Sequence, residues 1–492
     1  MRRHVSAAAL VVLLGAGCTV GPDYKRPAVD APKAYVWEVK DAKEVANAAW
    51  WQQFQDPVLD ALVVEALEKN RNVKIAAANV EQAAAVLIQT RSTLYPQVGY
   101  GAGATRQKAS ALGAVPLPAG YPNPQNVFQL AGTASWEIDL WGKVRRQSEA
   151  ASANLFATEE ARRGVVLSLV ASVANGYLQL RGYDEQLEIS KLTLKTYGES
   201  VRLFELQFKY GQVSQMTVEQ ARTQYETAAA TIPQIESQIV QTENALSLLL
   251  GHHPGPIARG KSIYELKLPA VPAGIPSEVL ENRPDIRQAE QNLVAANARI
   301  GAAKALYFPS ISLTGALGTS SGQLSDLFKG PAGVWSYAGS LTGPIFAGGA
   351  ISGQVRQAVA AREAALQTYA NAIESAFADV ENALAAKQKL GEQLEARMRL
   401  VKAAKEYERL ANLQYGGGYA PYSTVLQAEE KLFPAQLDVV TARTGYFASL
   451  VTIYKAMGGG WVTEADKLTV PLQEQKPAEG AAAGASPGGS PK

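Results

Sequence analysis

The sequence contains a single cysteine and three histidines in 492 residues. One cysteine excludes an intrachain disulfide framework and any zinc site built from cysteines. Two of the histidines, His252 and His253, lie between Gly251 and Pro254, which is typical of a solvated turn rather than of a metal site. No nucleotide-binding loop of the G-x-x-x-x-G-K type is present either. The sequence therefore predicts no metal and no cofactor.

Net charge and long apolar runs are also scarce. The formal net charge is +2, and no lysine-rich or arginine-rich block with interleaved aromatic residues occurs, so we expect no nucleic-acid partner. The longest apolar runs beyond the N-terminus, such as Val165–Ala174, are short or broken by serine and asparagine. A membrane helix needs about 20 apolar residues. If this chain crosses a membrane, it must therefore do so as strands.

The first residues have the pattern of a targeting segment. The positive stretch Met1–His4 precedes an apolar stretch, Val5–Gly17, that is too short to span a bilayer. Small residues then precede Cys18, as in bacterial lipoprotein signals, where the cysteine is lipidated. The usual leucine three positions before the cysteine is Gly15 here, so an ordinary secretory signal cut nearby is the alternative. Thr19, rather than aspartate, follows the cysteine and argues against retention in the inner membrane.

Two halves of the chain match at a nearly fixed offset. Asn79 recurs 213 positions later as Asn292, and farther along the chain Gly211 recurs 207 positions later as Gly418. The shift falls in a segment that must be a loop. A register kept over roughly 100 residues indicates one structural unit that is used twice.

Each half is predicted to contain a helix, two strands, a very long helix and a final helix. No proline occurs between Pro124 and Pro233 or between Pro344 and Pro421, and both stretches are rich in good helix formers. A helix of this length would extend about 100 Å, which exceeds a globular core and predicts a coiled-coil-like rod.

The expected organisation comprises a signal peptide (1–17), a lipidated extended leader (18–56), a first repeat (57–251), a linker (252–283), a second repeat (284–458) and a C-terminal segment (459–492) that is disordered from about residue 471. Within the repeats we expect first helices over Pro57–Leu94 and Pro284–Leu306, strands over 97–106, 127–140, 310–319 and 334–343, long helices over 143–209 and 350–414, and final helices over 214–251 and 421–458.

The four predicted strands alternate apolar or small residues with mostly polar ones. In Val127–Leu140, for example, Phe128 and Leu130 flank Gln129. Each strand is about long enough to cross a bilayer at a tilt. A lipid-facing sheet cannot leave its edges unpaired, and membrane barrels need about eight strands or more. A membrane location therefore requires oligomerisation, and three chains would supply twelve strands; the alternative is a soluble four-stranded sheet with one wet face.

Further motifs extend over about Cys18–Trp461. They are Gly21-Pro22-Asp23-Tyr24 and Pro27; Trp50-Trp51 and Phe54; Asp56-Pro57, Leu59, Leu62, Ala66-Leu67 and Asn70; Asp139-Leu140-Trp141-Gly142; Arg283 to Leu293; Tyr307-Phe308-Pro309; Gly348-Gly349; and Tyr415 to Ala428. In their order, spacing and duplication the chain resembles the TolC-type outer-membrane factors, specifically the lipoprotein branch that serves drug-efflux pumps.

The resemblance implies an α+β membrane protein in the outer membrane of a Gram-negative cell. It implies a homotrimer whose twelve-stranded β-barrel, with four strands from each chain, continues into a long α-helical periplasmic barrel. The implied partners are outer-membrane lipid, a periplasmic adaptor (membrane fusion) protein and an inner-membrane transporter of the resistance-nodulation-division type. The implied function is a passive exit duct that exports drugs or other small toxic compounds.

The long helices must each turn back at one end. The two turns lie at equivalent places, and the residues expected to form them are Phe208, Gly211 and Ser214 in the first repeat and Tyr415, Gly418 and Pro421 in the second. Glycine permits the left-handed cap that ends a helix, and serine or proline is typical of a helix start. The resemblance implies that these turns also dock the adaptor.

The resemblance also implies a closed periplasmic aperture at these turns. Tyr419, Ser423 and Gln427 are spaced by four residues, so we expect them to share one helix face that lines the aperture. Relatives often have leucine at the Ser423 position and aspartate at the Gln427 position, so an acidic gate is not expected here. We expect a ring of Tyr419 side chains to provide much of the occlusion.

No catalytic constellation is present, and we expect no enzyme activity. The adjacent pairs Glu159-Glu160 and Glu429-Glu430 point apart on helices and are interpreted as solvated. Two alternatives to an efflux duct remain, a protein-secretion duct and a periplasmic coiled-coil lipoprotein without a pore. The cysteine favours efflux over secretion, and the strand alternation argues against the poreless protein.

Overall fold

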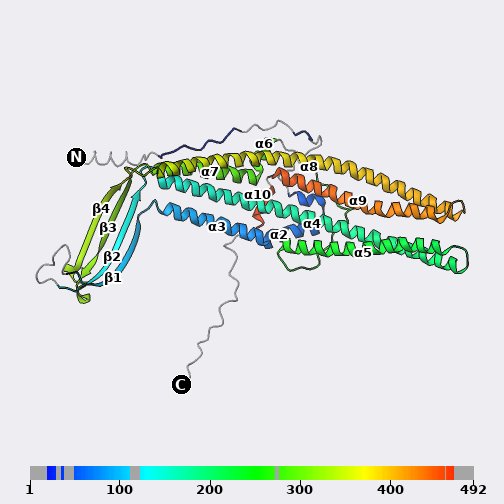
Figure 1. The fold of residues 1–492 in the computed structure, drawn as a ribbon, viewed down its shortest axis with the longest axis horizontal. Coiled ribbons are helices and arrows are strands. Elements are labelled where there is room, and N and C mark those ends of the chain that lie inside the picture. Colours follow the sequence, from blue (N-terminus) through cyan, green and yellow to red (C-terminus); the bar gives the residue numbers. More distant parts are fainter. Residues whose placement is uncertain are drawn as a thin grey trace, which may run out of the picture. The chain divides into compact units, whose positions relative to one another are not determined.

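The computed structural model describes residues 19–28, 35–37, 49–110, 122–271, 276–459 and 461–469. The predicted signal peptide, Cys18 and the tail from residue 471 lie outside the described residues. In chain order the first elements are η1 (Trp50–Phe54), α2 (Pro57–Lys69), α3 (Arg71–Ser92), β1 (Gln97–Gln107), β2 (Gln125–Ile138), α4 (Lys143–Lys209) and α5 (Gln215–Leu250) (Figure 1).

The remaining elements are α6 (Pro276–Asn282), α7 (Pro284–Ala305), β3 (Ser310–Ser321), η2 (Leu324–Asp326), η3 (Gly330–Ala332), β4 (Gly333–Thr342), α8 (Ala350–Gly416), α9 (Tyr422–Met457) and α10 (Trp461–Lys467). This combination of helices with one small sheet confirms the predicted α+β class. None of the described helices has both the length and the apolar character of a membrane span.

The first helix of the first repeat is divided, which corrects the single helix predicted over Pro57–Leu94. Asn70 has extended dihedral angles (φ −57°, ψ 131°) and separates α2 from α3. Its side-chain oxygen accepts hydrogen bonds from the amides of Asn72 (2.8 Å) and Val73 (3.2 Å), while its amide donates to the carbonyl of Leu249 (2.8 Å). The side chain thus caps α3 and competes successfully with a continuous helix.

The end of β2 also differs from the prediction, which extended the strand to residue 140. The strand ends at Ile138 because Asp139 caps the next helix. Its two carboxylate oxygens accept hydrogen bonds from the amides of Val144 (3.0 Å) and Arg145 (2.9 Å) at the start of α4. Two short helices, α6 and α10, lie in segments where no helix was predicted.

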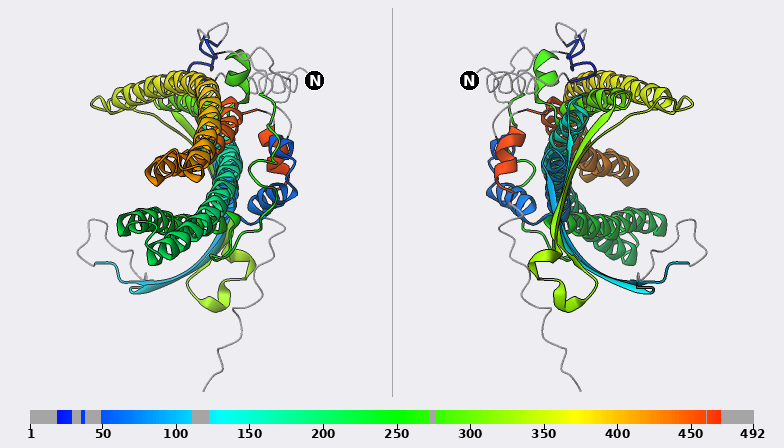
Figure 2. Two further views of the ribbon diagram at one scale, coloured as in Figure 1. Left: turned by 90° about the vertical axis from the view of Figure 1, so that its right-hand side faces the viewer. Right: turned by 90° about the vertical axis from the view of Figure 1, so that its left-hand side faces the viewer.

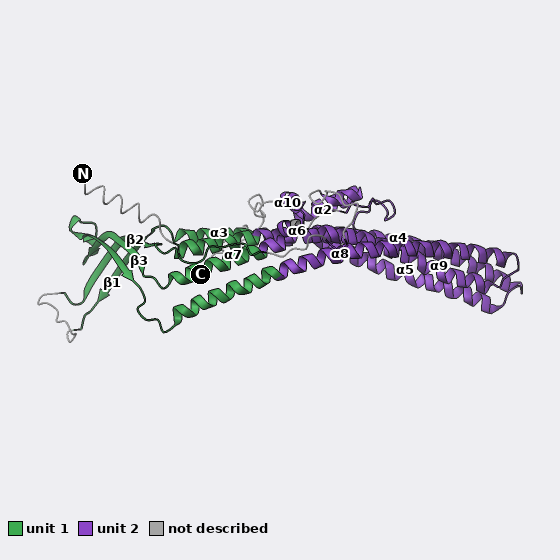
Figure 3. Cartoon of the chain, turned by 90° about the horizontal axis from the view of Figure 1, so that it is seen from above, with its two compact units in different colours: residues 1–28, 80–158, 289–370 green, residues 29–79, 159–288, 371–492 purple. Residues whose placement is uncertain are grey.

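The chain forms two compact units, and each takes part of both repeats (Figure 3). Unit 1 contains residues 1–28, 80–158 and 289–370, and unit 2 contains residues 29–79, 159–288 and 371–492. Unit 1 holds the sheet, and unit 2 holds the two helical turns at which the long helices reverse.

The sheet of unit 1 has four antiparallel strands in the order β1-β2-β3-β4, and it is curved (Figure 2). Its register places Tyr100 opposite Gly132, Gly132 opposite Leu317, and Leu317 opposite Trp335. Because paired residues point to the same side of a sheet, the apolar positions of the four strands share one face. Among the exposed side chains on this face, the Trp335 and Tyr337 rings are stacked with centroids 5.7 Å apart.

The core of unit 2 is rich in aromatic side chains. Trp50 is fully buried and stacks on Tyr454, with ring centroids 5.2 Å apart, and it meets Trp461 edge-on at 5.9 Å. Trp461 belongs to α10, so this short C-terminal helix closes the core.

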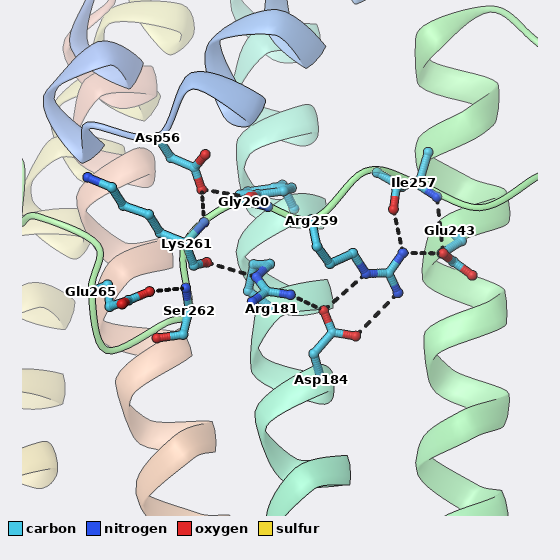
Figure 4. Close-up of polar contacts among 11 residues, drawn as sticks. Asp56, Arg181, Asp184, Glu243, Ile257, Arg259, Gly260, Lys261, Ser262 and Glu265 are labelled. Carbon is cyan, nitrogen blue, oxygen red and sulfur yellow. Dashed lines mark hydrogen bonds and ion pairs between the residues drawn. The ribbon is translucent and has the colours of Figure 1, made fainter.

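The chain segment after α5 is pinned to unit 2 by a polar network (Figure 4). Arg259 binds Asp184 on α4 at 3.1 Å and Glu243 on α5, and Arg181 donates to the carbonyl of Lys261 at 2.9 Å. The buried carboxylate of Asp56 accepts hydrogen bonds from the hydroxyl of Tyr177 (2.6 Å) and the amide of Lys261 (3.1 Å). The predicted linker is therefore a fixed part of unit 2 over its described residues 252–271.

Candidate functional site

The turn between α4 and α5 is set by a glycine and a serine. Gly211 has a left-handed φ of 72°, and its amide donates to the carbonyl of Phe208 at 2.9 Å. The amide of Gln212 reaches a carbonyl of the last helical turn at 2.9 Å, which satisfies the end of α4. Ser214 then caps α5, since its hydroxyl accepts a hydrogen bond from the amide of Thr217 at 3.4 Å.

The turn between α8 and α9 repeats this geometry. Gly418 has a φ of 76°, and its amide donates to the carbonyl of Tyr415 at 3.0 Å. The amide of Tyr419 donates to the carbonyl of Gln414 at 2.9 Å. Pro421 is the residue before α9 and has extended dihedral angles (φ −69°, ψ 157°). The two predicted turns thus have the same hydrogen-bonding pattern at matching positions.

The position of Tyr419 corrects the predicted helix face. Because α9 begins only after Pro421, Tyr419 lies in the turn and shares no helix face with Ser423 and Gln427. Its side chain is 89% exposed, and its ring lies against Gly417, where an added Cβ would be 2.9 Å from the ring. Ser423 is half-buried and Gln427 is exposed, so these two still share a face of α9.

A buried aromatic cluster holds the two turns together, and the sequence patterns did not reveal it. The rings of Phe204 and Tyr422 have centroids 4.1 Å apart, and Tyr415 lies 5.4 Å from Tyr422. The remaining buried members of this tip cluster are Val218, Ala221, Ala411, Val425, Leu426 and Ala428. The cluster joins α4, α5, α8 and α9, so the two turns are packed against each other through buried side chains.

The turns expose several large apolar side chains among polar ones. Phe208, for example, is 47% exposed. We use the name tip patch for five exposed apolar side chains at or beside the two turns, which are Leu206, Phe208, Tyr210, Met216 and Leu413. Several exposed large apolar residues grouped at one end of a protein mark an interaction surface more often than scattered ones do.

Two carboxylates that were interpreted as solvated are buried, which corrects that interpretation. Glu160 lies beside Arg287 at 3.0 Å and also pairs with Arg163, while burial raises its pKa. Glu429 is only 7% exposed, whereas Glu430 beside it is exposed. Burial, followed by the negative charge of Glu408, raises the pKa of Glu429 to about 7. Adjacent positions on a helix point about 100° apart, so one member of a charged pair can be buried while the other is solvated.

The candidate lipid site at Cys18 lies outside the described residues, but the residues that follow it are firmly held within unit 1. A side chain on Gly21 would collide with the backbone of Gly301, and Gly21 has a left-handed φ of 109°. Polar contacts of the described leader residues include Val20 N to Trp141 O (3.1 Å), Asp23 to Arg146 (2.7 Å), Asn297 Nδ2 to Pro22 O (2.9 Å) and Tyr24 OH to Glu290 (3.1 Å). These contacts come from both repeats.

Within the described ranges, no group of three or more histidine, cysteine, aspartate or glutamate side chains is placed to hold a metal ion. The described features of the turns are caps, packed aromatic rings and exposed apolar surface, which suit binding and gating.

Comparison with known proteins gives consistent matches along the chain. The profile of the outer membrane efflux protein family matches residues 62–252 and 275–459. The toluene efflux pump outer membrane protein TtgF of Pseudomonas putida is 36% identical over 474 residues, which cover 94% of this chain and 98% of that protein.

Solved structures of outer membrane channels are similar as well. The CmeC outer membrane channel of Campylobacter jejuni matches with a TM-score of 0.85 at 27% identity, over 92% of this chain and 99% of that chain. The open state of the MtrE outer membrane channel of Neisseria gonorrhoeae matches with a TM-score of 0.81 at 33% identity, over 90% of this chain and 99% of that chain.

Proposed function

Because this chain belongs to the outer membrane efflux protein family, it is the outer-membrane exit duct of an efflux pump, and we propose that it works as a homotrimer. The resemblance inferred from the sequence motifs is thereby confirmed. A duct of this kind is passive, so the energy for export comes from another protein of the pump.

The observation that carries the trimer proposal is the sheet. In a single chain β1 and β4 are edge strands, and the apolar face exposes large side chains such as Tyr100, Leu317 and Trp335. Such a face is stable in lipid, whereas unpaired strand edges are not. Pairing β4 of one copy with β1 of the next removes both edges. Three copies give twelve strands, which is within the range of known membrane barrels, whereas two copies give about the minimum of eight.

The proposed partners are a periplasmic adaptor and an inner-membrane transporter of the resistance-nodulation-division type. The tip patch supports an adaptor, since its exposed apolar side chains lie at or beside the two turns, each of which contains a left-handed glycine. The proposed cargo is a small toxic compound, in line with the toluene named for TtgF, and the transporter selects it.

Outer-membrane lipid is a further proposed partner, through the sheet and through lipidated Cys18. The contacts of residues 20–24 would keep this anchor in place beside the start of α4. A protein-secretion duct is the alternative function, and the names of the relatives favour efflux. The sheet, with its apolar face, argues against a periplasmic coiled-coil protein without a pore.

Site-directed crosslinking tests the proposed docking. In a Cys18→Ser background with an ordinary signal peptide, Gln212→Cys places a thiol in the exposed first turn. We expect it to crosslink to the adaptor encoded with the pump when cells are treated with a bifunctional thiol-and-amine reagent. The matched control is Ile75→Cys, which is exposed on α3 away from both turns and should not crosslink to that protein. Equal crosslinking of the two variants would contradict docking at the turns.

A further inference from the structure

Glu429 occupies an unusual place for a carboxylate. It lies on α9 next to Ala428 of the tip cluster, it is almost fully buried, and its Oε2 atom has no hydrogen-bond partner among the described residues. It makes no ion pair with any described side chain. A buried carboxylate that carries a charge without a partner is costly, whereas its protonated form is tolerated. The packed turns therefore favour a proton on this residue.

The groups around Glu429 do not neutralise a charge there. From α4, the hydroxyl of Tyr197 donates to the main-chain carbonyl of Glu429 at 3.4 Å, not to its carboxylate. From α8, the facing ionisable group is Glu408, whose negative charge further disfavours ionisation of Glu429. On α9 itself, Tyr422 is buried about two turns away, and burial raises the pKa of its hydroxyl, so it is likewise neutral.

The last helix packed on this region is α5, and it offers no free cation in the described part of the chain. Tyr225 of α5 packs beside the cluster formed by Tyr197, Ala228 and Phe433. Arg222, one turn earlier on α5, is already paired with Glu205 at 2.8 Å and with Glu219 at 3.1 Å.

A proline divides the tip part of α9 from the rest of the helix. Pro434 lies inside α9 and has no amide hydrogen, so the carbonyl of Glu430 lacks its helical hydrogen bond. Pro233 also lies inside a helix, at a later position in α5. Prolines of this kind are the usual sites of helix bending. The segment of α9 before Pro434 carries Glu429 together with the aperture candidates Ser423 and Gln427.

We propose that Glu429 is a proton-dependent latch that holds the tip segment of α9, residues 422–433, packed against α4 and α8 and so keeps the periplasmic aperture closed. This inference rests on the proposed function and adds a regulator to its site. When Glu429 is protonated the segment stays packed. When it ionises, burial becomes unfavourable, and the segment moves outward at Pro434 until the carboxylate reaches water.

The direction of the pH effect follows from the two environments of the carboxyl group. In the packed state the pKa is raised from 4.5 to about 7, and in a solvated, open state it returns to its ordinary value. The packed state therefore binds the proton more tightly. The ratio of the packed to the open population is highest below pH 4.5. It falls about tenfold for each pH unit between 4.5 and 7 and stays constant above pH 7. Raising the pH across this window opens the aperture.

Channel recordings on the full-length protein in planar bilayers test the latch. Between pH 5 and pH 7 we expect the ratio of open to closed time of the wild type to rise between about tenfold and a hundredfold. Glu429→Gln mimics the protonated side chain and should keep the pH 5 ratio throughout. The matched control Glu430→Gln removes the same charge from the exposed neighbour and should behave as the wild type does. A flat wild-type profile, or a Glu429→Gln profile equal to the wild type, would overturn the latch.

Two further readouts separate the latch from the duct. The infrared carboxyl band that is present in the wild type and absent in Glu429→Gln should titrate near pH 7, and a midpoint below about 5 would overturn the proposal. Amide exchange of residues 422–433, corrected for the intrinsic rate, should accelerate with pH in the wild type but not in Glu429→Gln. Absence of conductance at every pH would contradict the duct, while these two measurements would still decide the latch.

Discussion

Replacing Asp56 by alanine should loosen the contact of the segment after α5 with the rest of unit 2. The carboxylate of Asp56 is fully buried and accepts three hydrogen bonds, from the amide of Val58 at 2.9 Å, the hydroxyl of Tyr177 at 2.6 Å and the amide of Lys261 at 3.1 Å. Gly260 packs so closely that an added Cβ would collide with the carboxylate. The substitution removes every one of these acceptors at once.

The magnitude follows from the donors that remain. The hydroxyl of Tyr177 and the amide of Lys261 lose a charged acceptor in a buried place, at about 1–3 kcal/mol each. The cap on α2 is lost whether the segment is closed or open, so it does not add to this difference. Allowing for partial relaxation, we expect the free energy of local opening to fall by about 3 kcal/mol. This corresponds to an open population that is larger by about a hundredfold.

Limited trypsin digestion of the full-length protein measures this opening, because Arg259, Lys261 and Lys267 are cleavage sites within the segment. When the segment closes faster than it is cut, the cleavage rate follows the open population. We expect Asp56→Ala to be cleaved there about a hundredfold faster than the wild type. Tyr177→Phe deletes one donor and keeps the carboxylate, so its effect should be about tenfold.

The control substitution is Glu265→Gln, whose side chain accepts one exposed hydrogen bond from the amide of Ser262. We expect its cleavage rate to stay within a factor of about three of the wild type. If Asp56→Ala were cleaved as slowly as this control, the buried carboxylate would not be what pins the segment.

Three other changes give distinct outcomes. Tyr419→Ala should raise single-channel conductance. It should change the free energy of unfolding by less than about 0.5 kcal/mol, because the side chain is exposed. Unchanged conductance would show that Tyr419 does not line the aperture. Gly301→Val should displace the leader, since its side chain would meet the carbonyl of Val20, and trypsin cleavage after Lys25 should then accelerate at least about tenfold. The control is Gly353→Ala, whose added Cβ would have no heavy atom within 4 Å. Equal rates of cleavage after Lys25 in the two variants would contradict the leader contacts. Cys18→Ser with an ordinary signal peptide should still reach the outer membrane as a trimer, because the sheet holds it there, and complete loss of trimer would contradict this.

The long helices could be predicted from the sequence because their determinants are local. The stretch from Lys143 to Lys209 has no proline and consists of good helix formers, and Gly211 and Ser214 provide the stop and the next start. The strands could be predicted for the same reason, since the alternation of apolar and polar residues is visible within each single strand. In both cases neighbours in sequence decide the structure.

The features that were missed depend on partners far along the chain. Asn70 ends α2 with a side chain that also binds the carbonyl of Leu249, which no local pattern reveals. Glu429 and Glu430 look equivalent in sequence, and only the packing of α4 and α8 buries one of them. Tyr419 fits a spacing of four with Ser423, but the extended Pro421 delays the start of α9.

Single-channel recording of the purified full-length protein in planar bilayers tests the central claim, that this chain forms an outer-membrane duct, most directly. The protein should insert and give discrete conductance steps from a preparation that migrates as a heat-sensitive trimer. A soluble monomer that gives no conductance would contradict the duct.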